Sequence, residues 1–194
     1  MNPLKSVTGT IVLGFVVSLI VILILQSGVF SLWSTLTWLH VFAGVIWIGL
    51  LYYFNFVQAP AVAAAAADEG GPGAAGINKY VAPRALLWFR WGALATWITG
   101  ACVLEVGPFG LVNAFTFAPG VQIIGMGAWL GTIMLFNVWV LIWPNQKKIL
   151  GMVSATPEEI TKAKFVALMD SLTNTFLSIP MLMCMVGQGH GLPF

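Results

Sequence analysis

Two histidines and two of the methionines in this sequence could bind a metal or a redox cofactor. His40 lies inside a long apolar segment, whereas His190 lies near the carboxyl end between two glycines. Met181 and Met185 are four residues apart, continue the polar stripe of the last apolar segment and precede His190. Imidazole nitrogen and thioether sulfur are both axial ligands of haem iron. The pattern therefore predicts a b-type haem bound by His40, with His190, Met181 or Met185 as the second ligand.

The position of His40 leaves two interpretations open. On a helix, His40, Gly44, Trp47 and Leu51 share one face, so Gly44 leaves a slot one turn from the imidazole. A flat ring or a neighbouring helix would fill this slot. The alternative to a ligand is a buried imidazole that is hydrogen-bonded to a neighbouring backbone group or hydroxyl. For His190 the alternative is a solvated loop residue, because it must fold back by roughly 10 Å to reach the depth of His40.

Arg90 and Asp170 are the two charged residues expected to pair within apolar segments. Arg90 stands among tryptophans in the third segment and Asp170 in the fifth, each roughly 8 to 9 Å from the same end by helical rise. Charges within a membrane usually pair with one another, so we expect an ion pair that stabilises the fold. The alternative for Arg90 is a side chain that reaches the membrane interface. The stripe of Asp170, Thr173, Asn174 and Ser178 is expected to face the bundle.

The composition predicts an integral membrane protein. The chain has 194 residues, of which 59% are hydrophobic and only 7% charged, and its mean hydropathy is +0.95. Continuously apolar segments, without the alternation of barrel strands, favour an all-α bundle of transmembrane helices. We expect one transmembrane domain over residues 1–194 with five helices, near residues 7–26, 32–58, 85–106, 120–143 and 165–186.

The basic residues predict the orientation. With five helices, every lysine and arginine lies on the side of the amino terminus or at the helix ends there: Lys5, Lys79, Arg84, Arg90, Lys147, Lys148, Lys162 and Lys164. Because positive charge accumulates on the cytoplasmic side, the amino terminus is expected in the cytoplasm and the carboxyl terminus outside. The expected location is the bacterial inner membrane.

Other motifs bear on partners. Gly127 and Gly131 form a GxxxG that allows close helix packing, within the bundle or in a homo-oligomer. The sequence has no nucleophile and base arrangement, carboxylate pair, zinc site or Cys-x-x-Cys-His haem attachment. We expect no nucleic-acid partner, and no inverted repeat or pair of broken helices favours a transporter.

Several short motifs together resemble the membrane domain of the bacterial urate hydroxylase (membrane urate oxidase) family. They are Trp38-Leu39-His40, Trp47-Ile48-Gly49, Tyr53-Phe54-Asn55, Trp88-Phe89-Arg90-Trp91, Asn137-Val138-Trp139, Trp143-Pro144-Asn145-Gln146-Lys147 and Asn174-Thr175-Phe176-Leu177-Ser178-Ile179-Pro180. The resemblance runs from the second apolar segment to the end. Where members of that family carry an acidic residue and a histidine, this sequence has Gly92 and Thr173.

The resemblance implies an inner-membrane domain that passes electrons from urate oxidation to a c-type cytochrome, and it points to His40 as a haem or cofactor ligand. The chain contains no covalent haem motif, so we expect a redox or accessory subunit that exchanges electrons with a separate cytochrome. The alternative is a non-catalytic subunit that packs against a larger membrane protein complex. In that case His40, Arg90 and Asp170 serve only the fold.

Overall fold

The computed structural model describes residues 2–25 and 28–193, and these residues contain helices and no strands. Residue contacts divide the chain into two units, Met1–Ser31 and Leu32–Phe194. The first unit holds a short 3₁₀-helix, Pro3–Lys5, followed by α1, Val7–Leu25, in which no residue is buried. The expectation of one transmembrane domain stays a prediction.

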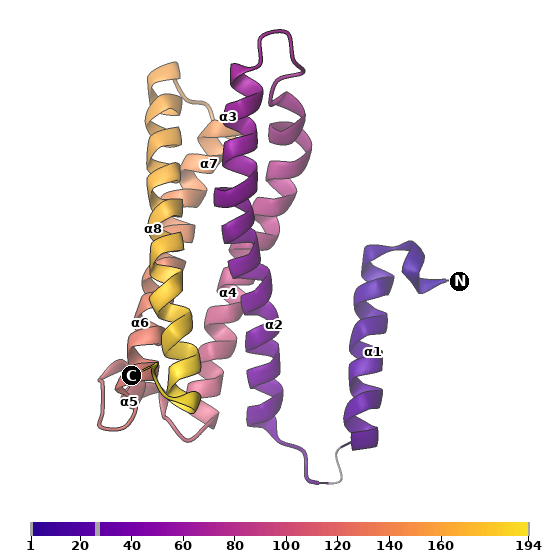
Figure 1. The fold of residues 1–194 in the computed structure, drawn as a ribbon, viewed down its shortest axis with the longest axis vertical. Helices are drawn as coiled ribbons and strands as arrows, with labels where there is room; N and C mark the ends of the chain where they lie inside the picture. Colours follow the sequence, from indigo (N-terminus) through magenta and orange to yellow (C-terminus); the bar gives the residue numbers. More distant parts are fainter. Residues whose placement is uncertain (1, 26–27, 194) are drawn as a thin grey trace. The chain divides into compact units, whose positions relative to one another are not determined.

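The second unit consists of four long helices that alternate in direction (Figure 1). The first is α2 (Leu32–Tyr52), which continues through the π-helical segment Tyr53–Gln58 into α3 (Ala59–Ala67). The second begins with π-helical Ile77–Val81 and continues as α4 (Ala82–Val106). After the short α5 (Leu111–Phe115), the third is α6 (Gln122–Phe136), π-helical Asn137–Ile142 and α7 (Trp143–Ile149). The fourth is α8 (Pro157–His190).

Neighbouring helices of this unit are antiparallel. α2 packs on α4 and α6 packs on α8, with further contacts of α4 with α6 and of α2 with α8. The helices α4 and α8 are therefore diagonal to each other. This arrangement decides which side chains of the bundle meet.

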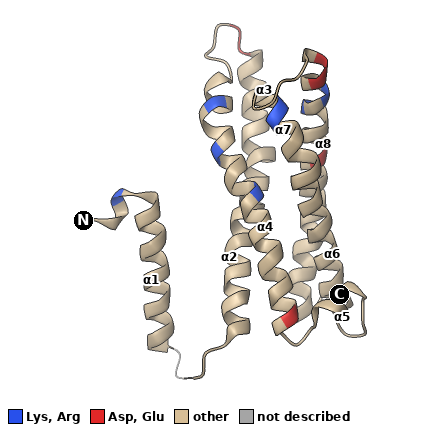
Figure 2. Ribbon diagram, turned by 180° about the vertical axis from the view of Figure 1, so that it is seen from behind, with Lys and Arg blue, Asp and Glu red and all other residues tan. Residues whose placement is uncertain are grey.

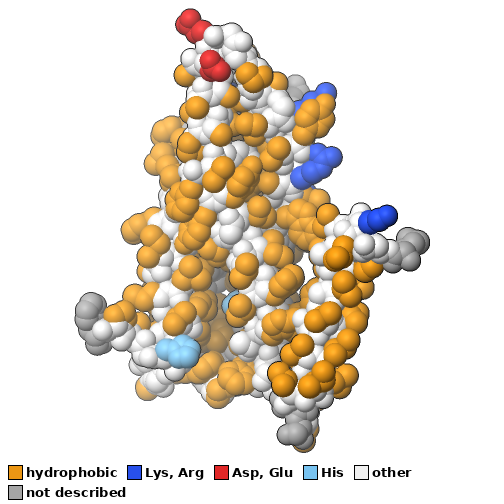
Figure 3. Space-filling model, turned by 45° about the vertical axis from the view of Figure 1, so that its right-hand side comes forward, with side chains coloured by type: hydrophobic (Ala, Val, Ile, Leu, Met, Phe, Trp, Pro, Cys, Tyr) orange, Lys and Arg blue, Asp and Glu red, His pale blue; other side chains and the backbone are white. Residues whose placement is uncertain are grey.

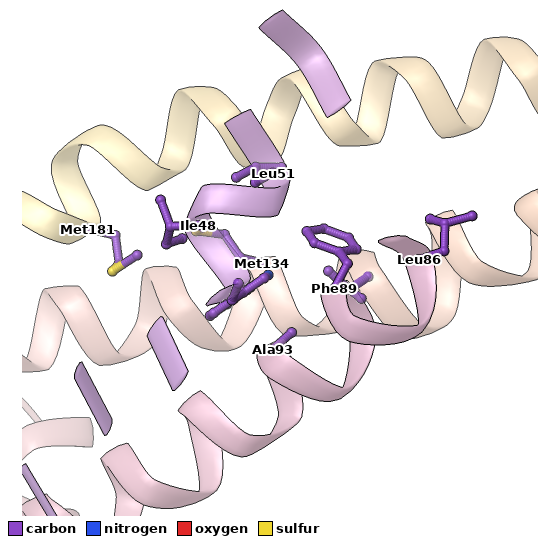
Figure 4. Close-up of a cluster of buried hydrophobic side chains, with 9 residues drawn as sticks. Ile48, Leu51, Leu86, Phe89, Ala93, Met134 and Met181 are labelled. Carbon is purple, nitrogen blue, oxygen red and sulfur yellow. The ribbon is translucent and has the colours of Figure 1, made fainter. Parts of the chain in front are cut away.

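All four long helices contribute to one apolar core (Figure 4). Its members are Trp47, Ile48 and Leu51 from α2, Leu86, Phe89 and Ala93 from α4, Met134 and Val138 from the third helix, and Met181 from α8. Ring packing extends it, because Phe54 lies edge-on to Phe89 with 5.4 Å between ring centroids. The core holds the four helices at fixed rotations and so orients the polar groups on either side of it.

The observed helices agree with most of the expected spans. Four helical stretches are long and apolar enough to cross a membrane: Val7–Leu25, Leu32–Ala67, Gln122–Ile149 and Pro157–His190. The third expected span corresponds to α4, a helix of 25 residues that carries Arg84, Arg90 and Glu105 and is less apolar. The alanine run after α2 continues the helix as expected, and its helix ends at Ala67.

The start of α8 is fixed by a capping box, as its sequence predicts. The Thr156 side chain accepts a hydrogen bond from the Glu159 backbone at 3.2 Å, and the Glu159 carboxylate accepts one from the Thr156 backbone at 2.9 Å. This backbone hydrogen bond, together with Lys148 at 3.7 Å, lowers the pKa of Glu159 below its usual value. The first two turns of α8 precede the apolar part of the helix, so the carboxylate lies outside the expected span.

Replacing Thr156 with Ala is expected to destabilise the protein by about 1 kcal/mol, because the helix loses one capping acceptor. Thr161→Ala is the matched control, since Thr161 only donates to the Pro157 carbonyl within the helix. The folded-state pKa of Glu159 is depressed, so its contribution is present at neutral pH and is lost as the pH falls through that lowered value. Thermal unfolding at neutral and acidic pH measures both effects. Equal unfolding temperatures for the two variants would contradict the prediction.

Candidate functional site

His40 lies on α2 with its imidazole against α4. Its Nδ1 is 2.8 Å from the Thr96 carbonyl oxygen and 3.4 Å from the Thr99 hydroxyl. A carbonyl oxygen can only accept, so Nδ1 carries the proton and Nε2 has the free lone pair. The ring lies over Gly100, where an added Cβ would be 2.8 Å from the imidazole Cε1. The half-buried imidazole therefore has a fixed tautomer and a fixed seat on α4.

The face of α2 that carries His40 is its interface with α4. A Cβ at Gly44 would meet the Thr96 methyl group at 3.7 Å, and one at Gly92 would be 3.5 Å from the Trp47 backbone nitrogen. Because Gly44 on α2 and Gly92 on α4 have no side chain, the two helix backbones can approach closely. The slot at Gly44 is therefore filled by a neighbouring helix, which was one of the two expected occupants. The motifs of this chain resemble a family with an acidic residue at the position of Gly92. Here the missing side chain of Gly92 allows α2 and α4 to approach closely.

The structure places the other three candidate ligands on α8. Met181 is buried in the apolar core, and the Met185 sulfur lies 3.5 Å from the Cβ position of Gly127 on α6. His190 is exposed and is the last residue of α8. The expectation that His190 lies in a loop and must fold back is therefore wrong, because the helix continues through Gly187 and Gly189.

A hydrogen bond in the middle of the bundle shows how His190 lies along the bundle relative to His40. The hydroxyl groups of Tyr52 and Ser178 are 2.9 Å apart and join α2 to α8. His40 precedes Tyr52 by 12 residues, and His190 follows Ser178 by 12 residues. Because α2 and α8 are antiparallel and each histidine lies 12 residues beyond this hydrogen bond, the two histidines lie toward the same end of the bundle.

The expected ion pair between Arg90 and Asp170 does not form. The Arg90 guanidinium lies over the Trp143 ring, 3.8 Å from its centroid, and the buried Asp170 Oδ2 has no hydrogen-bond partner in residues 2–25 and 28–193. The ion pair found in that part of the chain joins Lys148 and Glu159. The physical reason is rotation around the bundle: α4 and α8 are diagonal, so equal depth does not bring their side chains together.

A buried polar cluster next to the π-helical segments was missed by the sequence analysis. Asn174 accepts from Asn137 at 2.9 Å and donates to the Met134 carbonyl at 3.0 Å. The Met134 carbonyl also accepts from the Asn137 backbone N–H at the start of the π-helical segment, and the Asn174 amide gives it a second donor. Only the polar stripe on α8 was visible as a signal, and Thr173 of that stripe is exposed, contrary to expectation.

A second asparagine has the corresponding role at the other π-helical segment. Asn55 donates to the Leu51 carbonyl at 2.9 Å and to the Ser171 hydroxyl at 2.8 Å. Both asparagines thus join a π-helical segment to α8. Segments of this kind are frequent at functional sites.

Gly127 of the GxxxG motif packs within the bundle. An added Cβ there would be 3.1 Å from the Cys184 Cβ on α8, and Gly131 is buried with nothing near its Cβ position. This is the internal use of the motif. A homo-oligomer through Gly127 and Gly131 stays a prediction.

No curated protein and no solved structure matches this chain. One family model does match, over residues 106–194, which hold α5 to α8 with Asp170, Met181, Met185 and His190 but not His40. That model is described as Urate oxidase N-terminal, so the carboxyl-terminal part of this chain is similar to the amino-terminal domain of urate oxidase-related proteins.

Proposed function

We propose that this protein is a membrane-embedded redox subunit related to urate oxidases, which binds a b-type haem through His40 and exchanges electrons with a separate c-type cytochrome. The observation that carries the proposal is the distance of 2.8 Å between His40 Nδ1 and the Thr96 carbonyl oxygen. The His40 Nδ1–H is engaged by the Thr96 carbonyl, which leaves the Nε2 lone pair available to a metal. The match of residues 106–194 supports the relation to urate oxidases.

The helices would cross the inner membrane five times, α4 included. α4 lies beside α2 over most of its length, so a bilayer that contains α2 contains α4 as well (Figure 1). Within the second unit the lysines and arginines lie between one end and the middle, together with acidic residues, whereas the opposite end has the acidic residue Glu105 and no lysine or arginine among the described residues (Figure 2). By the excess of positive charge in the cytoplasm, the basic end faces inward and the end with His40 and His190 faces outward.

The donor groups fit a haem at this outer end. Histidine ligands of metals usually donate their second ring N–H to a carbonyl or carboxylate, which fixes the ring and raises its basicity, and the Thr96 carbonyl does this for His40. His190 ends α8 toward the same end of the unit, and the molecular surface is hollowed in this half (Figure 3). A bound haem would supply one-electron transfer, while His40 and Thr96 hold and orient it.

His190 is the second ligand that the packing favours over the two methionines. Met181 is 6% exposed within the core, and the Met185 sulfur packs against α6. The His190 imidazole is exposed and lies beyond the last core residue of α8. It can therefore turn toward a ligand without a change in the core.

Replacing His40 with Ala is expected to abolish the Soret absorption of the purified protein, because the iron loses the ligand that is fixed by α4. His190→Ala is expected to keep the haem and to shift its visible bands, since only the second ligand changes. Visible absorption spectra of the oxidised and reduced protein measure both effects. A colourless and well-folded wild-type protein would contradict the proposal and would favour the non-catalytic subunit of a larger complex.

A further inference from the structure

A cavity of about 370 Å³ lies in the basic half of the second unit, between the four long helices. Its polar lining comes from four separate helical elements and consists of Asn55, Gln58, Asn78, Gln146, Lys164 and Ser171. We call this space the amide cavity. Gln58 follows His40 by 18 residues, or about 27 Å along the helix at its usual rise. The amide cavity is therefore separate from the histidine site.

The amide cavity contains a hydrogen-bond acceptor without a donor. The Gln58 Oε1 is buried and has no hydrogen-bond partner among the described residues. An unpaired buried acceptor is unfavourable, because burial removes its water without supplying another donor. The amide of neighbouring Asn55 cannot relieve it, because its two N–H groups serve the Leu51 carbonyl and the Ser171 hydroxyl. A bound molecule with an O–H or N–H group would supply the missing donor.

Lys164, on another helix, is a cationic hydrogen-bond donor, whereas the Gln58 Oε1 is an acceptor. It lies on α8 at the edge of the amide cavity, and no acidic group in the described residues pairs with it. Its ammonium group can only donate. A ligand oxygen, partly or fully negative, is therefore favoured on this side.

The remaining lining is apolar and includes two packed aromatic rings. Phe54 and Phe89 line the cavity and meet edge-on, with an interplanar angle of 81°. Aromatic walls favour a flat ring in an offset or edge-on arrangement. The amide cavity thus combines ring-shaped apolar space with one acceptor and one cationic donor from different helices.

We propose that the amide cavity binds the head group of a membrane hydroquinone. The ring would lie beside Phe54 and Phe89, one phenolic O–H would donate to Gln58 Oε1, and an oxygen would accept from Lys164. A hydroquinone has this donor, whereas the oxidised quinone lacks it, so the site discriminates between the two. The choice of a redox ring rests on the proposed function, but the binding contacts do not involve His40.

The test is anaerobic binding of duroquinol and of duroquinone to the purified full-length protein, followed by titration calorimetry. Duroquinol is expected to bind at least about tenfold more tightly than duroquinone, since one hydrogen bond to a buried group is worth about 1.4 kcal/mol. Gln58→Leu and Lys164→Gln are each expected to weaken duroquinol binding about tenfold. Lys162→Gln is the matched control, because Lys162 lies on the same helix and does not line the cavity.

Gln58→Leu has a second expected effect that a simple folding defect would not produce. Removal of an unpaired buried acceptor is expected to raise the unfolding temperature of the ligand-free protein while it weakens binding. Equal affinity for duroquinol and duroquinone, or unchanged binding in Gln58→Leu, would overturn the proposal. Urate that displaces duroquinol from the wild type but not from Gln58→Leu would also overturn the hydroquinone proposal. The amide cavity would then be a binding site for an oxopurine.

The two proposals are separated by His40→Ala. This variant is expected to bind duroquinol as the wild type does, whether or not the wild-type protein contains haem. Loss of duroquinol binding in His40→Ala would overturn the assignment to the amide cavity.

Discussion

Replacing Asn174 with Ala is expected to lower the free energy of unfolding by about 2 kcal/mol, because it leaves the buried Asn137 side-chain amide without its acceptor and removes one of two donors from the Met134 carbonyl. Asn174 is fully buried, and its side chain joins the Asn137 amide to the Met134 carbonyl. Neither group can reach water in the middle of the bundle. The loss should exceed that of an ordinary surface substitution severalfold.

Thr173→Ala is the matched control for this prediction. Thr173 is the preceding residue, is exposed, and should change stability by no more than about 0.5 kcal/mol. The double variant Asn137→Ala/Asn174→Ala should be less destabilised than the sum of the single variants, because both partners of one hydrogen bond are then removed. Unfolding in detergent, followed by circular dichroism, compares Asn174→Ala, Asn137→Ala, the double variant and Thr173→Ala with the wild type. A similar loss in Asn174→Ala and Thr173→Ala would contradict the role of the cluster.

The local features of the fold could be predicted from the sequence because each depends on a few neighbouring residues. The start of α8 follows from Thr156 and Glu159, three residues apart. The apolar segments predicted the positions of the long helices, which extend beyond the expected spans to Ala67, Ile149 and His190. The end of α8 was missed, since Gly187 and Gly189 were taken as the end of a helix that continues to His190.

Contacts between helices were less predictable, because depth along an axis says nothing about rotation around it. Arg90 and Asp170 lie on diagonal helices, and Arg90 packs on Trp143 instead. The partners of Asn174 could not be inferred for a related reason. Asn137 and Met134 meet Asn174 because of how the third helix is rotated against α8, which the apolar pattern of the sequence does not show.

The histidine site combines a predicted and an unpredicted part. His40 was recognised by its type and its apolar surroundings, and its hydrogen bond to backbone was one of two stated alternatives. The position of its ring over Gly100 could not be predicted, because it depends on how α2 packs against α4. The amide cavity had no sequence signal, because its polar lining residues are spread from Asn55 to Ser171 over all four long helices.

Replacing Gly100 with Ala is expected to remove the haem from the protein although His40 itself remains. The new methyl group would be 2.8 Å from the imidazole Cε1 and 3.0 Å from Nδ1, which is closer than these atoms can approach. The imidazole is the free end of its side chain, so it should rotate away from α4 and lose the Thr96 carbonyl. The rest of the bundle can stay folded, at a cost of about 1 kcal/mol for the lost hydrogen bond.

Gly49→Ala separates this effect from a general response to a larger side chain. Gly49 lies within α2 and is exposed, with nothing within 4 Å of its Cβ position, so alanine there should stabilise the helix slightly. Its Soret absorption should equal that of the wild type, while Gly100→Ala should resemble His40→Ala. An unchanged Soret band in a haem-containing Gly100→Ala protein would show that α4 does not set the ligand geometry. The predicted loss would instead show that the iron depends on the orientation of the His40 ring, which α4 fixes through one glycine and one backbone carbonyl.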